Sequence, residues 1–122
     1  MTAPNIVGVT TITGKTEGVN NVTTTGSGMA SNGSSSGKVF KVNALFVSNK
    51  TATDATVTVY YTESVSTTPV NYVVCQSVVI PGGTTLDVLR KAVYIAEDQR
   101  ITVKAGTAAS LDAVISYEEI ND

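Results

Sequence analysis

The fold of this chain is decided by residues 91–120, KAVYIAEDQRITVKAGTAASLDAVISYEEI. Apolar and polar residues alternate here in three successive runs, whose apolar members are Val93 and Ile95, then Ile101, Val103 and Ala105, then Ala113, Ile115 and Tyr117. A period of two predicts half-buried β-strands, because successive side chains of an extended chain point to opposite faces. The polar residues 97–99 predict a hairpin tip and residues 106–110 the next connection. The stretch is therefore expected to form a C-terminal meander.

The rest of the chain has a composition that suits strands, since it is rich in the β-branched residues Thr and Val. Strands are expected at residues 5–13, 38–48, 55–63, 71–80 and 84–89, with a polar edge strand around Val22 as a further candidate. Pro81-Gly82-Gly83 ends the longest apolar run, because Pro lacks an amide donor for the sheet. About eight short strands at roughly ten-residue spacing predict one all-β domain, an antiparallel β-sandwich or jelly-roll-like barrel.

Two of these strands carry predictions about their faces. In residues 38–48, alternation places Phe40, Val42, Ala44 and Phe46 on one face and Val39, Leu45 and Val47 on the other. Apolar residues on both faces predict a central strand. In residues 55–63, Tyr60 and Tyr61 point to opposite faces, so at most one of them lies in the core of a simple sandwich.

The N-terminal part, residues 1–37, is expected to form a first strand, a break at residues 14–21, and a flexible arm rich in Gly, Ser and Thr. Within the arm, Asn32-Gly33 is a strong turn signal. It is compatible with a hairpin turn preceded by a short strand through Met29, which we favour, and with a mobile surface loop. Residues 38–122 are expected to form the sandwich core of what is one domain overall.

Composition argues against several functional classes. The net charge is −2 and 15% of the residues are charged, so the clustered Lys and Arg of a nucleic-acid footprint are not found. No apolar run has the length of a membrane span, and the N-terminus lacks the layout of a signal peptide, so use without secretion is expected. The single cysteine, Cys75, excludes an intrachain disulfide and is expected to be a small buried hydrophobe.

Residue chemistry predicts a protein that is not an enzyme and has no cofactor or metal. There is no His to activate Cys75 or a Ser, and Glu118 and Glu119 are neighbours in a strand and point to opposite faces. The candidates that remain are partner-binding residues: Met29 and Asn32 in the arm, and Tyr60 and Tyr72 on the strands. Exposed Tyr suits contact with proteins or sugars, although cross-strand packing is the alternative role.

Several segments resemble small structural proteins of tailed bacteriophages, marine cyanophages in particular. The resemblance covers residues 38–120 and rests on KVFKVNALFVSN at 38–49, IPGGTTLDV at 80–88, YIAEDQRI at 94–101 and VISYEEI at 114–120. The chain departs from the family pattern at residues 96–99, where Ala-Glu-Asp-Gln replaces an acidic pair followed by Gly. The shared motifs are structural, so they indicate a kind of protein and no active site.

The resemblance implies a β-sandwich that is a component of the virion, assembled in the cytoplasm of the host cell. The leading expectation is a capsid decoration or cement protein that stabilises the head through protein–protein contacts. A head–tail connector, a tail or baseplate component, and a carbohydrate-binding host-attachment module are the alternatives. Expected partners are the major capsid protein or head–tail and tail proteins, with a homo-oligomer, for which a trimer is favoured, and neither nucleic acid nor membrane.

Overall fold

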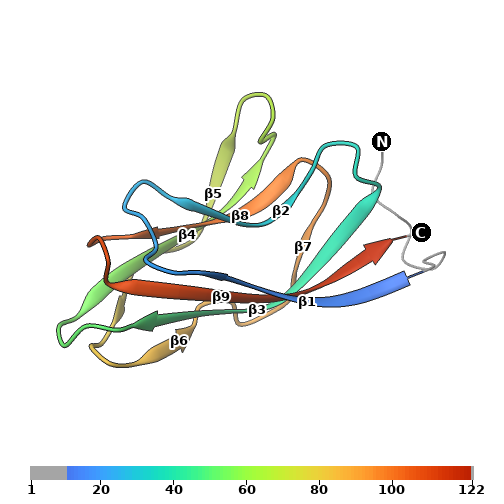
Figure 1. Cartoon of the computed structure of the whole chain (residues 1–122). Helices are drawn as coiled ribbons and strands as arrows, with labels where there is room; N and C mark the ends of the chain where they lie inside the picture. Colours follow the sequence, from blue (N-terminus) through green and yellow to red (C-terminus); the bar gives the residue numbers. More distant parts are fainter. Residues whose placement is uncertain (1–10, 122) are drawn as a thin grey trace.

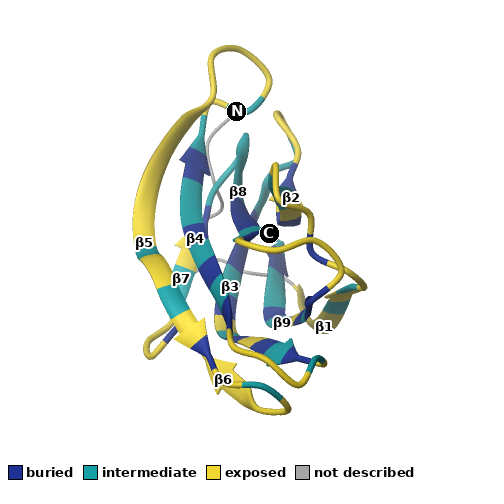
Figure 2. Cartoon of the chain, turned by 90° about the vertical axis from the view of Figure 1, so that its left-hand side faces the viewer, coloured by how far each residue is buried: buried dark blue, intermediate teal, exposed yellow. Residues whose placement is uncertain are grey.

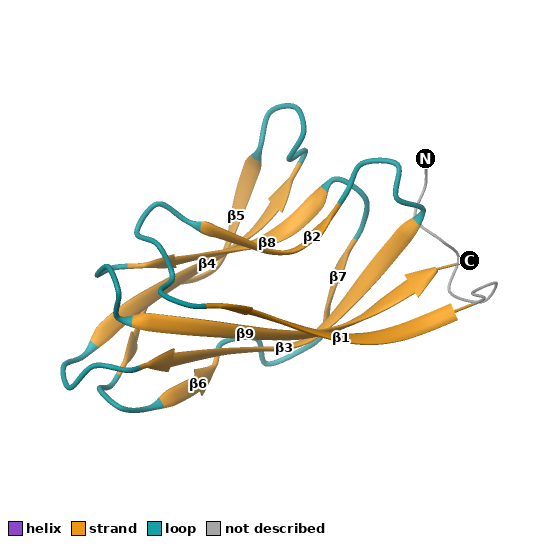
Figure 3. Cartoon of the chain, in the orientation of Figure 1, coloured by secondary structure: helices purple, strands orange, loops and turns teal. Residues whose placement is uncertain are grey.

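The computed structural model describes residues 11–121, and that part consists of strands joined by turns and loops (Figure 3). The strands are β1 (Thr11–Val19), β2 (Ser27–Asn32), β3 (Lys38–Asn49), β4 (Ala55–Glu63), β5 (Val70–Ile80), β6 (Thr85–Asp87), β7 (Val93–Ile95), β8 (Gln99–Ala105) and β9 (Leu111–Asn121). The expected strands at 38–48, 55–63 and 71–80 are confirmed to within a residue, whereas the strand expected at 84–89 is limited to β6.

The strands form two antiparallel sheets that face each other (Figure 1). Sheet A has the order β1-β9-β3-β6, and β7 also pairs with β3. Sheet B has the order β2-β8-β4-β5. The all-β sandwich expected from the sequence is confirmed. Its core lies between the sheets, where β8 and β9 bury the alternating residues of the closing stretch: Ile101, Val103, Ala105, Ala113, Ile115 and Tyr117.

The closing stretch is not a meander, although its strands lie where they were expected. β7 belongs to sheet A, β8 to sheet B and β9 to sheet A again, so both connections cross between the sheets. The turn after β7 is held by the backbone N–H of Asp98, which donates to the carbonyl of Asn32 at 2.9 Å. The hairpin predicted at residues 97–99 was wrong, because β7 and β8 lie in different sheets and do not pair. Alternation indicates which side chains of a strand are buried, but it does not indicate which other strand pairs with it.

β3 is a central strand, as expected, but its faces change in the middle. Val42 pairs with Tyr117 and Ala44 pairs with Ser116, which leaves Asn43 as the extra residue of a β-bulge. A bulge shifts the alternation by one residue. Beyond it, Leu45 and Val47 face the core, while Phe46 is exposed. The prediction that Ala44 and Phe46 share a face with Phe40 and Val42 was therefore wrong.

The N-terminal part differs more from its expectation. β1 runs through the break predicted at residues 14–21 and pairs along its whole length with β9. Val22 is buried in the connection after β1, where its N–H donates to the carbonyl of Leu111 at 2.8 Å, so the edge strand predicted there is absent. Residues 5–10 of the first predicted strand lie outside the described residues.

The segment predicted to be a flexible arm is built into the sandwich. β2 pairs with β8 in sheet B, and its residues Met29 and Ala30 are fully buried. The short strand through Met29 is confirmed. β2 and β3 lie in different sheets, however, so the turn between them does not form a hairpin. A boundary at residue 37 does not separate an arm from a core, because both sides of it contribute buried residues.

Candidate functional site

Two of the predicted partner-binding residues lie inside the molecule. Met29 is fully buried, and Asn32 is 3% exposed. The amide nitrogen of Asn32 donates to the carbonyls of Lys38 at 2.8 Å and Ile95 at 3.1 Å, and its oxygen accepts from the Ser36 hydroxyl. Asn32 thus joins β2 to the start of β3 and the end of β7. The prediction that Met29 and Asn32 meet a partner is corrected: their side chains have structural roles.

The two predicted tyrosines lie on neighbouring strands at the other edge of sheet B. Tyr60 pairs with Val73 and faces away from the core, and Tyr61 pairs with Tyr72. The rings of Tyr61 and Tyr72 stack with centroids 5.9 Å apart, and the Tyr61 hydroxyl donates to Glu63 at 3.0 Å. Burial, followed by this bond to Glu63, raises the pKa of Tyr61 to about 12. Tyr61 is thereby held in place and supports Tyr72, which is 52% exposed.

Tyr72 belongs to a larger exposed surface along β5. This strand is the last of sheet B, and it pairs with β4 alone. None of its eleven residues is charged. Figure 2 shows most of its length as exposed. The large apolar side chains exposed on it are Val70, Tyr72, Val73, Val74 and Val79. Exposed apolar side chains gathered along one strand are typical of a site of protein contact.

The exposure of β5 was not predicted from its sequence. A nearly continuous apolar run is typical of a strand buried on both faces, and the same residues form an edge strand here. Two irregularities in its pairing with β4 lie between Val57 and Tyr60, and Ser77 has a positive φ of 51°. Such bulges bend and twist a strand. In this protein they interrupt the regular pairing in the part of β5 that contains Cys75 and Val78.

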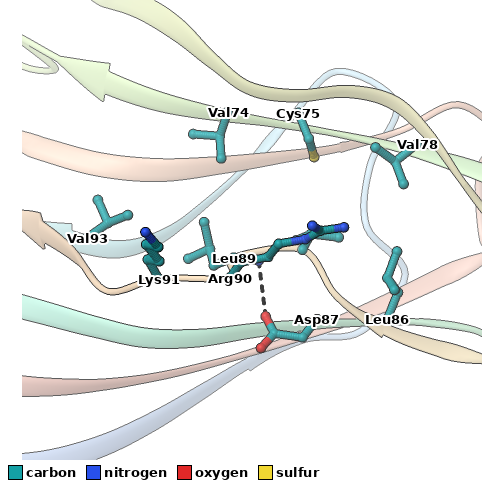
Figure 4. Close-up of a pocket in the computed structure, with 10 residues that line it drawn as sticks. Val74, Cys75, Val78, Leu86, Asp87, Leu89, Arg90, Lys91 and Val93 are labelled. Atoms are coloured by element: carbon teal, nitrogen blue, oxygen red, sulfur yellow. Dashed lines mark hydrogen bonds between the residues drawn. The ribbon is translucent and has the colours of Figure 1, made fainter.

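A pocket of about 490 Å³ lies between β5 and the segment that runs from β6 to β7 (Figure 4). β5 contributes Val74, Cys75 and Val78, and the opposite side contributes Leu86, Val88, Leu89 and Val93. We call this pocket the edge groove. Leu89 is almost fully buried and forms its floor, whereas Leu86 and Val74 are exposed at its rim.

The polar side chains of the edge groove are of two kinds. Asp87 is fixed by backbone bonds, since its Oδ1 accepts from the N–H of Leu89 at 3.0 Å and of Leu45 at 3.4 Å. Arg90 and Lys91 also line the groove, and the Arg90 side chain extends into the space between its two sides (Figure 4). Among residues 11–121, the ion pairs involve Lys15, Lys38 and Lys50, and neither Arg90 nor Lys91.

Cys75 lies in the edge groove and is partly buried, whereas a small buried hydrophobe was expected. Burial raises the pKa of its thiol, an effect that the backbone N–H of Val59 partly offsets. The thiol is therefore protonated at neutral pH, the form that is a poor nucleophile. Within the described part of the chain, no three His, Cys, Asp or Glu converge as metal ligands, and no helix is long and apolar enough to cross a membrane.

The arrangement thus offers an apolar contact surface with two cations, Arg90 and Lys91, that form no ion pair within residues 11–121. The surface consists of β5 and the edge groove. Of the four partner-binding residues predicted from the sequence, it includes Tyr72. Met29 and Asn32 lie in β2, at the opposite edge of sheet B. Comparison with known proteins adds no assignment, since no protein-family model matches the sequence and no curated protein is significantly similar to it.

Proposed function

We propose that this chain is a non-enzymatic structural protein that joins a larger assembly through protein–protein contacts made by β5 and the edge groove. The observation that carries the proposal is the exposed apolar surface of β5, which has no charged residue along its length. Water disfavours such a surface, and covering it with a partner would remove several large side chains from water at about 25 cal/mol per Å².

The resemblance of residues 38–120 to small structural proteins of tailed bacteriophages extends this proposal to the virion. A capsid decoration or cement protein is the leading position, because such a protein needs a stable body and an adhesive surface and needs no reaction chemistry. A connector, tail or baseplate component is the alternative position. All of these require β5 to contact another virion protein or another copy of this chain.

The test combines light scattering on the purified protein with co-sedimentation on purified phage capsids. We expect an oligomer, a trimer in the cement role, that sediments with the capsids. Val74→Lys places a charge on β5 at the rim of the edge groove and is expected to abolish co-sedimentation. Val114→Lys is the matched control, since Val114 is also exposed but lies on sheet A. Recovery of the protein only in the tail fraction of disrupted particles would exclude decoration.

A carbohydrate-binding module is a second candidate, favoured by one observation. Tyr72 is half exposed, and its ring is supported from behind by Tyr61, an arrangement suited to stacking against a sugar. A glycan array separates the two functions: binding that disappears in Tyr72→Ala and persists in Tyr60→Ala would support the module. The absence of binding to any glycan, together with capsid binding, would leave the structural role.

A further inference from the structure

The edge groove lies where the sandwich lacks a strand. On one side of it β5 ends sheet B, and on the other side β6 and β7 end sheet A. We infer that the groove accepts an extended segment of a partner protein, in which apolar residues alternate with polar ones and one residue carries a carboxylate. The segment pairs with the free edge of β5, and its carboxylate binds Arg90 and Lys91. This inference rests on the proposed structural function and names the partner's chemistry.

The free edge of β5 is the first reason for an extended peptide. β5 pairs with β4 alone, so the N–H and C=O groups along its other edge have no strand partner among residues 11–121. The other edge strands are shorter, charged or irregular: β6 and β7 have three residues each, β1 carries Lys15 and Glu17, and β2 has six residues with a shift of register after Met29. A peptide strand supplies the missing hydrogen-bond partners, as in other complexes formed by strand addition. A lipid chain of the same apolar character cannot.

The lining of the groove is the second reason. A strand laid along β5 points alternate side chains to the same face. Those facing inward would meet Val74 and Val78 on one side and Leu86 and Val88 on the other. Leu86, which is exposed in the free chain, would become covered. The pattern required of the partner is therefore apolar at every second residue, except where the inward side chain meets Arg90 and Lys91.

Arg90 and Lys91 are the reason why the partner segment is expected to carry a carboxylate. Arg90 and Lys91 line the groove and form no ion pair among the described residues. A carboxylate placed there gains attraction from both, and a partner cation would be repelled. The groove carboxylate Asp87 is already bound by two backbone N–H groups. A second copy of β5 does not meet this requirement, because β5 contains no acidic residue.

The experiment uses a fluorescent peptide with the sequence Thr-Val-Thr-Glu-Thr-Val-Thr, in which Glu lies on the same face as the two Val, and a matched peptide with Lys in place of Glu. Fluorescence anisotropy is expected to show the Glu peptide binding about tenfold more tightly than the Lys peptide. The double variant Arg90→Glu/Lys91→Glu is expected to reverse this preference. Lys104→Glu, a change of the same type on β8 outside the groove, is expected to leave it unchanged.

A third peptide separates strand addition from apolar contact alone. N-methylation of alternate residues of the Glu peptide keeps its side chains and removes the hydrogen bonds of one edge. Binding is expected to be lost for this peptide, and hydrogen exchange of β5 amides is expected to slow only with the unmodified one. Equal binding of the Glu and Lys peptides, no binding of either, or no effect of methylation would overturn the inference.

Two further outcomes distinguish this inference from the proposed function. If the wild type and Arg90→Glu/Lys91→Glu sediment equally with capsids, the structural function stands and the carboxylate-bearing segment is excluded. If the peptides behave as expected and capsids are not bound, the segment stands and the capsid role fails. A dimer whose β5 amides are protected without peptide would show that a second copy covers the edge, which would also overturn the inference.

Discussion

Glu119 forms ion pairs with two lysines on sheet A, one from each neighbouring strand. Glu119 on β9 binds Lys15 of β1 at 2.6 Å and Lys38 of β3 at 2.5 Å. The three residues lie diagonally across adjacent strands, because Glu119 is directly opposite Thr13 and Phe40. Hydrogen bonds from Lys15 and Lys38 hold the pKa of Glu119 below its ordinary value of 4.5. The carboxylate therefore stabilises the fold in its ionised form.

The pH dependence of this contribution has a definite sign. A carboxyl whose pKa is lower in the folded state contributes stability that is fully present above its unfolded pKa and is lost as pH falls through its folded pKa. We expect Glu119→Gln to be less stable than wild type at neutral pH. The difference in unfolding free energy should shrink below the ordinary pKa of 4.5. Urea denaturation followed by circular dichroism, from neutral pH to below about pH 3, measures this difference.

Glu118→Gln is the control for this experiment. Glu118 is the neighbouring carboxylate on β9 and forms no ion pair among the described residues. Its substitution is expected to lower the free energy of unfolding at neutral pH by less than Glu119→Gln does, because no ion pair is lost. A difference between Glu119→Gln and wild type that stays constant across the acid range would contradict the role assigned to the two lysines.

Among the elements, β9 shows most directly how alternation determines burial. It lies in the middle of sheet A between β1 and β3, and its side chains point alternately into the core and away from it. Ile115 is fully buried in the core cluster, and its neighbour Val114 is exposed beside Phe46 on the outer face. Two adjacent residues of similar type therefore occupy opposite environments.

Substitution of these two neighbours measures that difference. Ile115→Ala removes buried methyl and methylene groups and leaves a cavity, so it is expected to lower the free energy of unfolding by about 2–5 kcal/mol. Val114→Ala removes side-chain atoms that are partly in water, since Val114 is 40% exposed, and is expected to cost less than about 1 kcal/mol. Denaturant titration of both variants measures the two values. Equal losses would show that the burial pattern of β9 is wrong.

At the scale of the whole molecule, the strand order determines how the chain can fold. In residues 11–121 only β4 and β5 are both sequence neighbours and sheet neighbours, whereas β1 pairs with β9 and β2 pairs with β8. To form most of these strand pairs, the chain must therefore close long loops. The entropy that this closure costs is lost before the stabilising contacts between the strands form.

This topology predicts slow refolding. We expect refolding from denaturant with a time constant on the order of milliseconds to seconds, the range of β-sandwich proteins dominated by distant pairings. Stopped-flow measurement of tyrosine fluorescence suits the chain, which has five Tyr and no Trp. Refolding within microseconds would contradict the strand order, because such speed requires mainly local contacts.

The edge groove is also a property of the whole molecule, and it explains why the candidate site was only partly predicted. Tyr72 was found because an exposed aromatic residue is a recognisable candidate. Arg90 and Lys91 were missed, because two adjacent cations in a loop have no local pattern that marks them as a site. They become candidates only when β5, which is distant in sequence, lies beside them.

The sequence by itself determined the class of fold and the position of most strands in the second half of the chain. β3, β4, β5 and the buried faces of β8 and β9 follow from alternation, because the period of two is a local property of an extended backbone. It also placed the turns at Pro81-Gly82-Gly83 and after β3, where the backbone preferences of single residues decide.

Only the tertiary structure decided which strands are neighbours and which surface is left open. Met29 and Asn32, which follow a Gly-rich run that reads as flexible, are held by β8, Lys38 and Ile95. The bulge at Asn43 reverses the faces of β3, and the edge position of β5 exposes an apolar run that suits a buried strand equally well. These outcomes depend on hydrogen bonds and packing between residues far apart in the chain, which no local pattern encodes.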